Sequence, residues 1–160
     1  MALLNALKWA GATKGTSYEM VPSWCDACRT TKRKGTSFID LFRAARTLPL
    51  IGVRKAKPKV KLADINAHLK YGGAVILGSF SESMNGFHWF LVTERINLAG
   101  KISYRVVNFD HRTTQCLVSA RMIKNSMRLA IKRSGMKEAA VCRKDYPCAI
   151  FLQKNRKEVI

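Results

Sequence analysis

The chain has 160 residues, 48% of them hydrophobic, which is enough for a core without disulfide cross-links. It contains 29 lysines and arginines and 10 acidic residues, so the formal net charge is +19. Such a charge attracts phosphate polymers, anionic membrane surfaces and acidic proteins, so nucleic acid is one candidate partner, and a solvated basic surface without a specific ligand is the alternative. No stretch approaches the ~18 to 20 apolar residues of a membrane-spanning helix. We expect a single domain over residues 1–160. The expected location is the cytoplasm, and for a viral protein it is the host cell cytoplasm or the virion.

Residues 1–22 are expected to form an N-terminal extension. It begins with a short amphipathic stretch, Leu3 to Trp9, and continues through a loop rich in glycine, threonine and serine. A proline and a serine then precede Cys25. The residues after Cys25 favour a helix over 26–34, ended by Gly35.

Two further helices are predicted before the first strand. Ser37 is a suitable N-cap with Asp40 three residues later, and apolar residues follow at helical spacing up to the next proline. A basic segment over 51–60 comes next, with no assigned element. Residues 61–70 favour a short amphipathic helix, ended by a glycine pair at 72–73.

The pattern then changes to β-structure. Residues 74–78 form an apolar run typical of a buried strand, and residues 87–93 indicate a second strand. A turn at 97–100 leads to an alternating partner strand over 101–108. These elements predict an antiparallel sheet.

The last part of the chain, 116–160, is expected to contain a helix and a terminal strand. Residues 116–134 have helical spacing, residues 137–141 favour a strand or a short helix, and 148–152 favour an edge strand. Since helices come first and an antiparallel sheet later, the predicted fold class is α+β.

The cysteines allow three interpretations. An odd set of five, without a secretory signal, favours free thiols, metal ligands or a nucleophile over a disulfide frame. Cys25 and Cys28 follow Trp24 in the pattern of a thioredoxin active site, but the buried strand that should precede this motif is absent. A zinc site would need a second ligand pair, and Cys142 and Cys148 are six residues apart, a weak match. We predict no metal and no cofactor.

In the third interpretation, Cys25 is a catalytic nucleophile. At a helix N-terminus, unsatisfied N–H groups and the helix dipole stabilise a thiolate. His88 lies in a strand, and Asn108 and Asp110 lie at the end of the next strand, so they supply a base and a group that orients it. A core histidine is the alternative for His88, and a turn former is the alternative for Asp110.

Three stretches resemble the papain-like cysteine peptidases, most closely those that remove leader peptides from bacteriocins. The stretches are Cys25 with residues 35–45, residues 62–77, and residues 88–93 with 104–110. The resemblance implies a papain-like fold, with N-terminal helices packed on a C-terminal antiparallel sheet. It also implies that Cys25 is the nucleophile, His88 the general base, and Asp110 or Asn108 the group that orients the imidazole.

One position departs from this family. The family usually has a glutamine six residues before the cysteine, whose amide stabilises the oxyanion, and this chain has Glu19 there. An ionised carboxylate cannot donate that hydrogen bond. Asn5, Ser17, Ser23 or a backbone N–H would have to replace it. We predict a cysteine peptidase or amide hydrolase acting on a protein or peptide, and the alternative is an inactive papain-like scaffold that binds nucleic acid or builds a virion.

Overall fold

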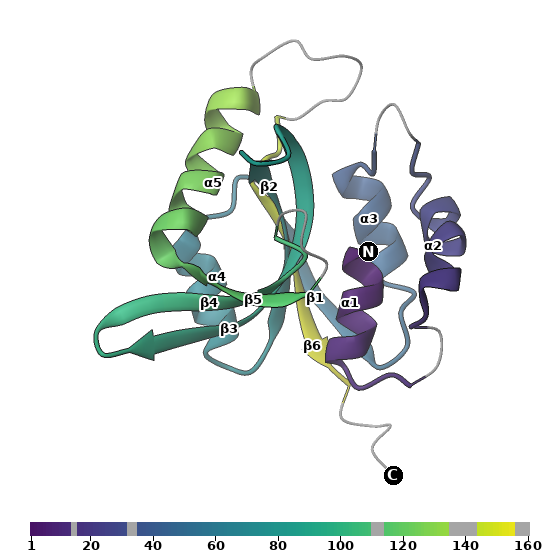
Figure 1. Ribbon diagram of the computed structural model, residues 1–160. Coiled ribbons are helices and arrows are strands. Elements are labelled where there is room, and N and C mark those ends of the chain that lie inside the picture. The colour runs from purple at the N-terminus through teal and green to yellow at the C-terminus, as the bar shows by residue number, and fades with distance from the viewer. Residues whose placement is uncertain (14–15, 32–34, 110–113, 135–143, 156–160) are drawn as a thin grey trace.

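The structure is a computed structural model that describes residues 1–160 except 14–15, 32–34, 110–113, 135–143 and 156–160. Within the described residues, six strands form one antiparallel sheet in the order β1-β6-β2-β3-β4-β5, with helices on both faces (Figure 1). The strands are β1 (Ile51–Lys57), β2 (Ala74–Ser81), β3 (Gly86–Leu98), β4 (Lys101–Val107), β5 (Gln115–Ser119) and β6 (Cys148–Lys154). The predicted α+β class and antiparallel sheet are confirmed.

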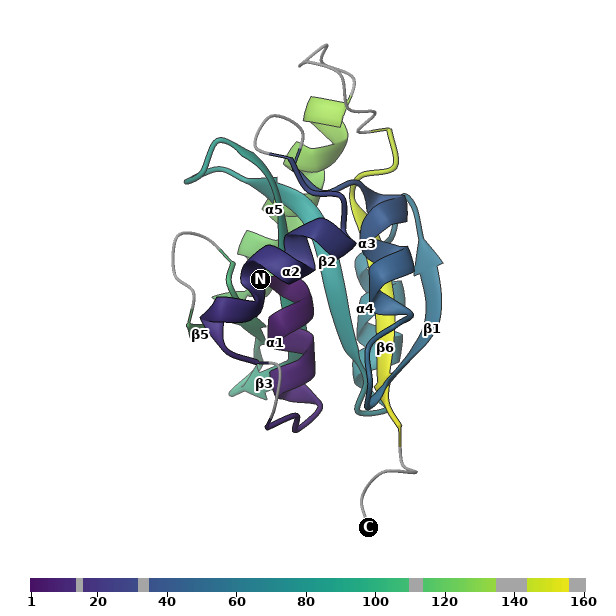
Figure 2. The ribbon, with the colours of Figure 1, turned by 90° about the vertical axis from the view of Figure 1, so that its right-hand side faces the viewer.

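One face of the sheet carries α1 (Ala2–Trp9), α2 (Val21–Ala27) and α3 (Phe38–Ala45), which lie in front of the strands in Figure 2. The 3-10 turn η1 (Tyr18–Met20) leads into α2. In α1 the first six residues are all buried, and they pack against β2 and β3. The first helix of the segment expected as an extension is therefore part of the core. The predicted N-cap is confirmed, since Asp40 donates its N–H to the Ser37 hydroxyl at 3.1 Å.

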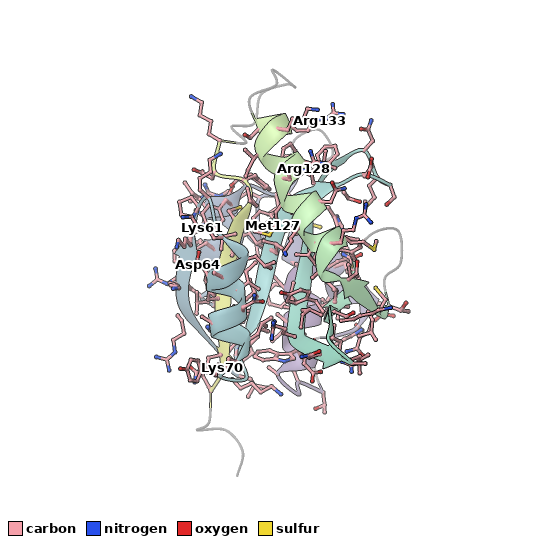
Figure 3. All side chains as sticks on the ribbon, turned by 90° about the vertical axis from the view of Figure 1, so that its left-hand side faces the viewer. Lys61, Asp64, Lys70, Met127, Arg128 and Arg133 are labelled. Atoms are coloured by element: carbon pink, nitrogen blue, oxygen red, sulfur yellow. The ribbon has the colours of Figure 1, made fainter. Side chains whose placement is uncertain are left out.

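The opposite face carries α4 (Leu62–Leu69) and α5 (Ala120–Ser134), side by side in Figure 3. The core beneath them includes Phe90 of β3 and Phe151 of β6. The helix predicted over 61–70 is confirmed, and Gly72 after it has φ +76°, a conformation that favours glycine. No described helix combines the length and the hydrophobicity needed to cross a lipid bilayer.

Three local predictions were wrong, and the basic segment over 51–60, which had no assigned element, contains β1. The first residues of the helix predicted over 116–134 form β5. The strand predicted at the sheet edge is β6, which lies between β1 and β2. The helix predicted over 26–34 is instead α2, which ends at Ala27. The element predicted over 137–141 lies outside the described residues.

Asp64 stabilises the first turn of α4. Its carboxylate accepts hydrogen bonds from the Lys57 ammonium at 2.9 Å and from the Lys61 N–H at 3.0 Å. Both hydrogen bonds lower the pKa of Asp64, and the bond from Lys57 has the larger effect. Because the pKa is lower in the folded state, the carboxylate stabilises the fold at pH values above the unfolded-state pKa, which is about 4. This stabilisation is lost as the pH falls through the folded-state pKa.

Asp64→Asn is therefore expected to lower the free energy of unfolding at pH 7 by about 1 kcal/mol or less. The difference from wild type should shrink as the pH falls below about 4 and through the lowered folded-state pKa, because the carboxylate is then progressively protonated. Urea unfolding curves at pH 7 and at a series of lower pH values measure it. A difference that is independent of pH would contradict this role.

Candidate active site

Cys25 lies near the end of a short helix. Pro22 is in the first turn of α2, where its missing N–H costs nothing, so the helix begins before Cys25 and not at it. After α2, Arg29 adopts φ +51°, and the N–H of Thr30 donates to the Cys25 carbonyl at 2.8 Å. This pairing closes the helix C-terminus. The expectation that a helix N-terminus stabilises the Cys25 thiolate was therefore wrong.

A cavity of about 380 Å³ brings together three of the four predicted catalytic residues. Cys25 of α2, His88 of β3 and Asn108, which follows β4, all line it. Trp24 and Trp89 form part of its wall. The fourth candidate, Asp110, lies outside the described residues. The cavity is thus built from segments far apart in the sequence.

His88 and Asn108 are joined by a short hydrogen bond. The Nε2 atom of His88 lies 2.6 Å from the backbone oxygen of Asn108. Because a carbonyl oxygen can only accept, Nε2 is the donor of this hydrogen bond. Asn108 has φ +64°, which turns the chain as β4 ends. Asn108 was one of the two predicted partners of the imidazole, and in the structure its backbone carbonyl accepts this hydrogen bond.

The strand register constrains how His88 can meet Cys25. His88 is paired with Ser79 of β2, and the Ser79 hydroxyl accepts a hydrogen bond from Ser126 of α5 at 2.9 Å. Directly opposite residues of an antiparallel pair share a face, so the base of the His88 side chain is on the α5 side, while α2 covers the other side. Among the described residues, no hydrogen bond joins Cys25 to His88. Proton transfer would therefore require the imidazole and the thiol to reach the same side of the sheet.

The second cysteine of the C-x-x-C pattern is a buried thiol. Cys28 is 3% exposed and belongs to the core under α1 and α3. Burial is the main cause that raises the pKa of Cys28 to about 11, opposed in part by the nearby amino group of Met1. Cys28 is therefore a neutral thiol at pH 7, whereas Cys25 is half-buried and borders the cavity. This difference makes Cys25 the accessible thiol of the pair.

None of the side chains proposed to replace the family's glutamine lines the cavity. Glu19, Ser17 and Ser23 are exposed, and Asn5 is buried on α1. Trp24 does line the cavity, and its buried indole N–H has no acceptor among the described residues. Trp24 was not among the predicted residues of this site, although its position next to Cys25 in the sequence was a usable signal.

Other chemistries find less support in the geometry. No disulfide joins the described cysteines, Cys25, Cys28, Cys116 and Cys148, to one another, and no cluster of three or more metal-ligating side chains occurs within the described ranges. Cys142, which the zinc interpretation also needs, falls outside those ranges.

Comparisons with known proteins add no relative. No protein family model, curated protein or solved structure matches the chain. The likeness to papain-like peptidases therefore depends on the residues of this chain alone.

Proposed function

We propose that the protein is a papain-like thiol peptidase or amide hydrolase with Cys25 as its nucleophile. The observation that carries the proposal is the cavity lined by Cys25, His88 and Asn108 together. A nucleophile, a base and a group that fixes the base are the parts that thiol catalysis needs. The hydrogen bond from Nε2 to the Asn108 carbonyl holds the ring at one nitrogen, and the proposal assigns proton acceptance to the other, Nδ1.

In the proposed reaction, His88 Nδ1 takes the proton of the Cys25 thiol, and the sulfur attacks a carbonyl carbon of the substrate. The C–N bond then breaks, and the imidazolium gives its proton to the departing amine. Water attacks the resulting thioester, which releases a carboxylic acid and restores the thiol. The indole N–H of Trp24 is a candidate donor to the oxyanion, because it is buried beside Cys25 without an acceptor in the described part of the chain.

Alkylation with iodoacetamide tests the proposal without a known substrate. Cys25 and Cys116 are both half-buried, so exposure alone predicts similar labelling rates for them. At pH 7 we expect Cys25 to react at least ~10-fold faster than Cys116, because a base that removes its proton increases the thiolate fraction. Cys28 should remain unlabelled because of its raised pKa. Mass spectrometry of the digested protein measures each site.

His88→Ala is expected to remove the preference for Cys25. His68→Gln is the matched control, because His68 bonds the Leu152 carbonyl at 2.7 Å and does not line the cavity. Equal labelling of Cys25 and Cys116 in the wild type, or a preference that survives in His88→Ala, would contradict the proposed base. The alternative of an inactive papain-like scaffold would then be favoured.

A further inference from the structure

Helix α5 carries a row of exposed positive charges. Four of its basic residues recur every three or four positions, so they follow one side of the helix over about 16 Å. We call this row the basic stripe, and its members are Arg121, Lys124, Arg128 and Lys132. The three ion pairs of the described residues all lie on other elements. Figure 3 shows Arg128 on this helix, with Arg133 one turn beyond it.

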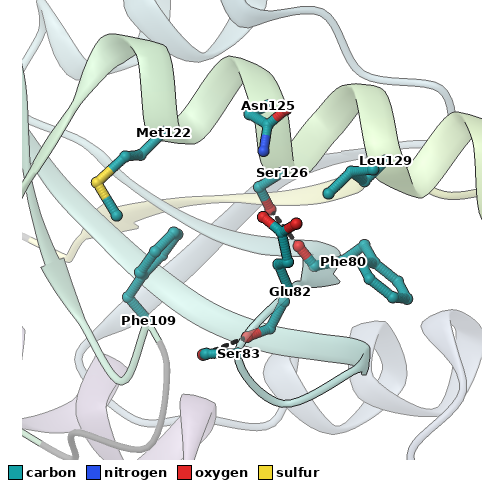
Figure 4. Close-up of a pocket in the computed structure, with 9 residues that line it drawn as sticks. Phe80, Glu82, Ser83, Phe109, Met122, Asn125, Ser126 and Leu129 are labelled. Atoms are coloured by element: carbon teal, nitrogen blue, oxygen red, sulfur yellow. Dashed lines mark hydrogen bonds between the residues drawn. The ribbon is translucent and has the colours of Figure 1, made fainter.

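A pocket of about 370 Å³ adjoins the basic stripe. Its residues come from α5, from the end of β2 and the turn that follows it, and from the segment after β4, as Figure 4 shows. We call it the α5 pocket, and it is lined by Phe80, Ser81, Glu82, Ser83, Phe109, Met122, Asn125, Ser126 and Leu129. Met122 and Asn125 also line a shallower hollow bounded by Arg121, Lys124 and Arg128. The pocket and the stripe are therefore one continuous surface.

The α5 pocket combines apolar walls with polar groups. Phe109 packs edge-on against Phe90, with ring centroids 5.1 Å apart, so its orientation is held from behind. Met122 extends toward Phe109 in Figure 4. Asn125 accepts a hydrogen bond from Arg128 at 2.7 Å, which leaves its amide N–H groups as donors, and the exposed Glu82 adds an acceptor. A flat heterocycle with donors and acceptors on its edge matches this lining.

We propose that this surface binds single-stranded nucleic acid, with phosphates on the basic stripe and one base in the α5 pocket. Single strands are bound by positive grooves that follow the backbone and by aromatic side chains that contact the bases. In a duplex the base is stacked and would have to leave the helix to enter the pocket. An anionic membrane would match the charge of the stripe, but it offers no partner for the polar groups of a concave pocket. The inference does not depend on the proposed hydrolase.

Fluorescence anisotropy with a labelled 12-nucleotide oligo(dC) tests the stripe. In about 0.1 M salt we expect the double variant Lys124→Gln/Arg128→Gln to bind about 10-fold more weakly than wild type. The slope of log K against log salt concentration should also be smaller in magnitude by about 1.4, because each of the two lost phosphate contacts contributes ~0.7. The control is Lys70→Gln/Arg95→Gln, which removes the same charge from exposed residues off this helix. It should weaken binding less than about twofold. Equal losses in the two double variants would overturn the proposal, because binding would then follow total charge.

The pocket is tested separately from the stripe. Phe109→Leu keeps an apolar contact for Phe90 but removes the ring, so we expect about a fivefold or greater loss of affinity with an unchanged salt slope. Oligo(dC) should bind more tightly than oligo(dT), because only cytosine carries an amino group for Glu82, and Glu82→Gln should reduce this preference. Circular dichroism melts check that each variant is folded. Equal affinity for a duplex of the same length, or displacement of the oligonucleotide by phosphatidylserine vesicles, would overturn the proposal.

Discussion

Phe151→Ala is expected to lower the free energy of unfolding by about 3 to 5 kcal/mol. Phe151 is fully buried on β6, where it is paired with Val75 of β2 and Lys55 of β1. Its ring and the His68 ring pack edge to face with centroids 5.1 Å apart, and the Lys55 ammonium lies 4.9 Å from its centroid. The neighbours belong to two strands and a helix, so they can fill the vacated space only in part, and a cavity remains.

Urea unfolding followed by circular dichroism measures this loss. Phe151→Leu serves as the control, since it keeps most of the apolar volume and should cost markedly less. A loss below about 1 kcal/mol for Phe151→Ala would match a half-exposed residue of an edge strand. It would contradict the central position of β6.

Gly78→Ala is expected to destabilise the fold by about 1 to 3 kcal/mol. A Cβ atom at Gly78 would lie 2.5 Å from Cζ3 of Trp89, its cross-strand partner. The indole cannot simply move aside, because Trp89 donates its N–H to the Thr36 carbonyl at 3.1 Å and its ring packs against Tyr146 and Phe38. The strand must therefore shift, or the indole must lose this bond.

The same substitution should disturb the candidate active site, because Trp89 lines the cavity next to His88. We expect the preferential alkylation of Cys25 to fall in Gly78→Ala. Gly86→Ala is the matched control, since its Cβ would have the Met84 carbonyl at 3.8 Å as its nearest neighbour, an ordinary contact. In a Trp89→Leu background the cost of Gly78→Ala should shrink, and an unchanged cost would show that the clash with the indole is not its cause.

The candidate active site could be predicted only in part from the sequence. The types and the order of Cys25, His88 and Asn108 pointed to thiol chemistry, and the structure does place the three around one cavity. The prediction that Cys25 begins its helix was wrong. A proline just before Cys25 indicates an interruption ahead of the helix, but proline is also favoured in the first turn of a helix, which is where Pro22 lies. The face on which His88 lies depends on its pairing with Ser79, and no local pattern specifies that register.

By itself the sequence determined the elements whose signals are local. The Ser37 cap, the glycine that ends α4, and the β3–β4 turn at Ala99 and Gly100 are all found where their residue types predict, because caps and turns depend on a few adjacent dihedral angles and hydrogen bonds. The order of the strands was decided only by tertiary structure. The apolar β6 is central, while the lysine-bearing β1 is at the edge, where its cations remain in water. The two cavities likewise form only when distant segments pack on the sheet, since burial and contact between elements depend on the whole fold.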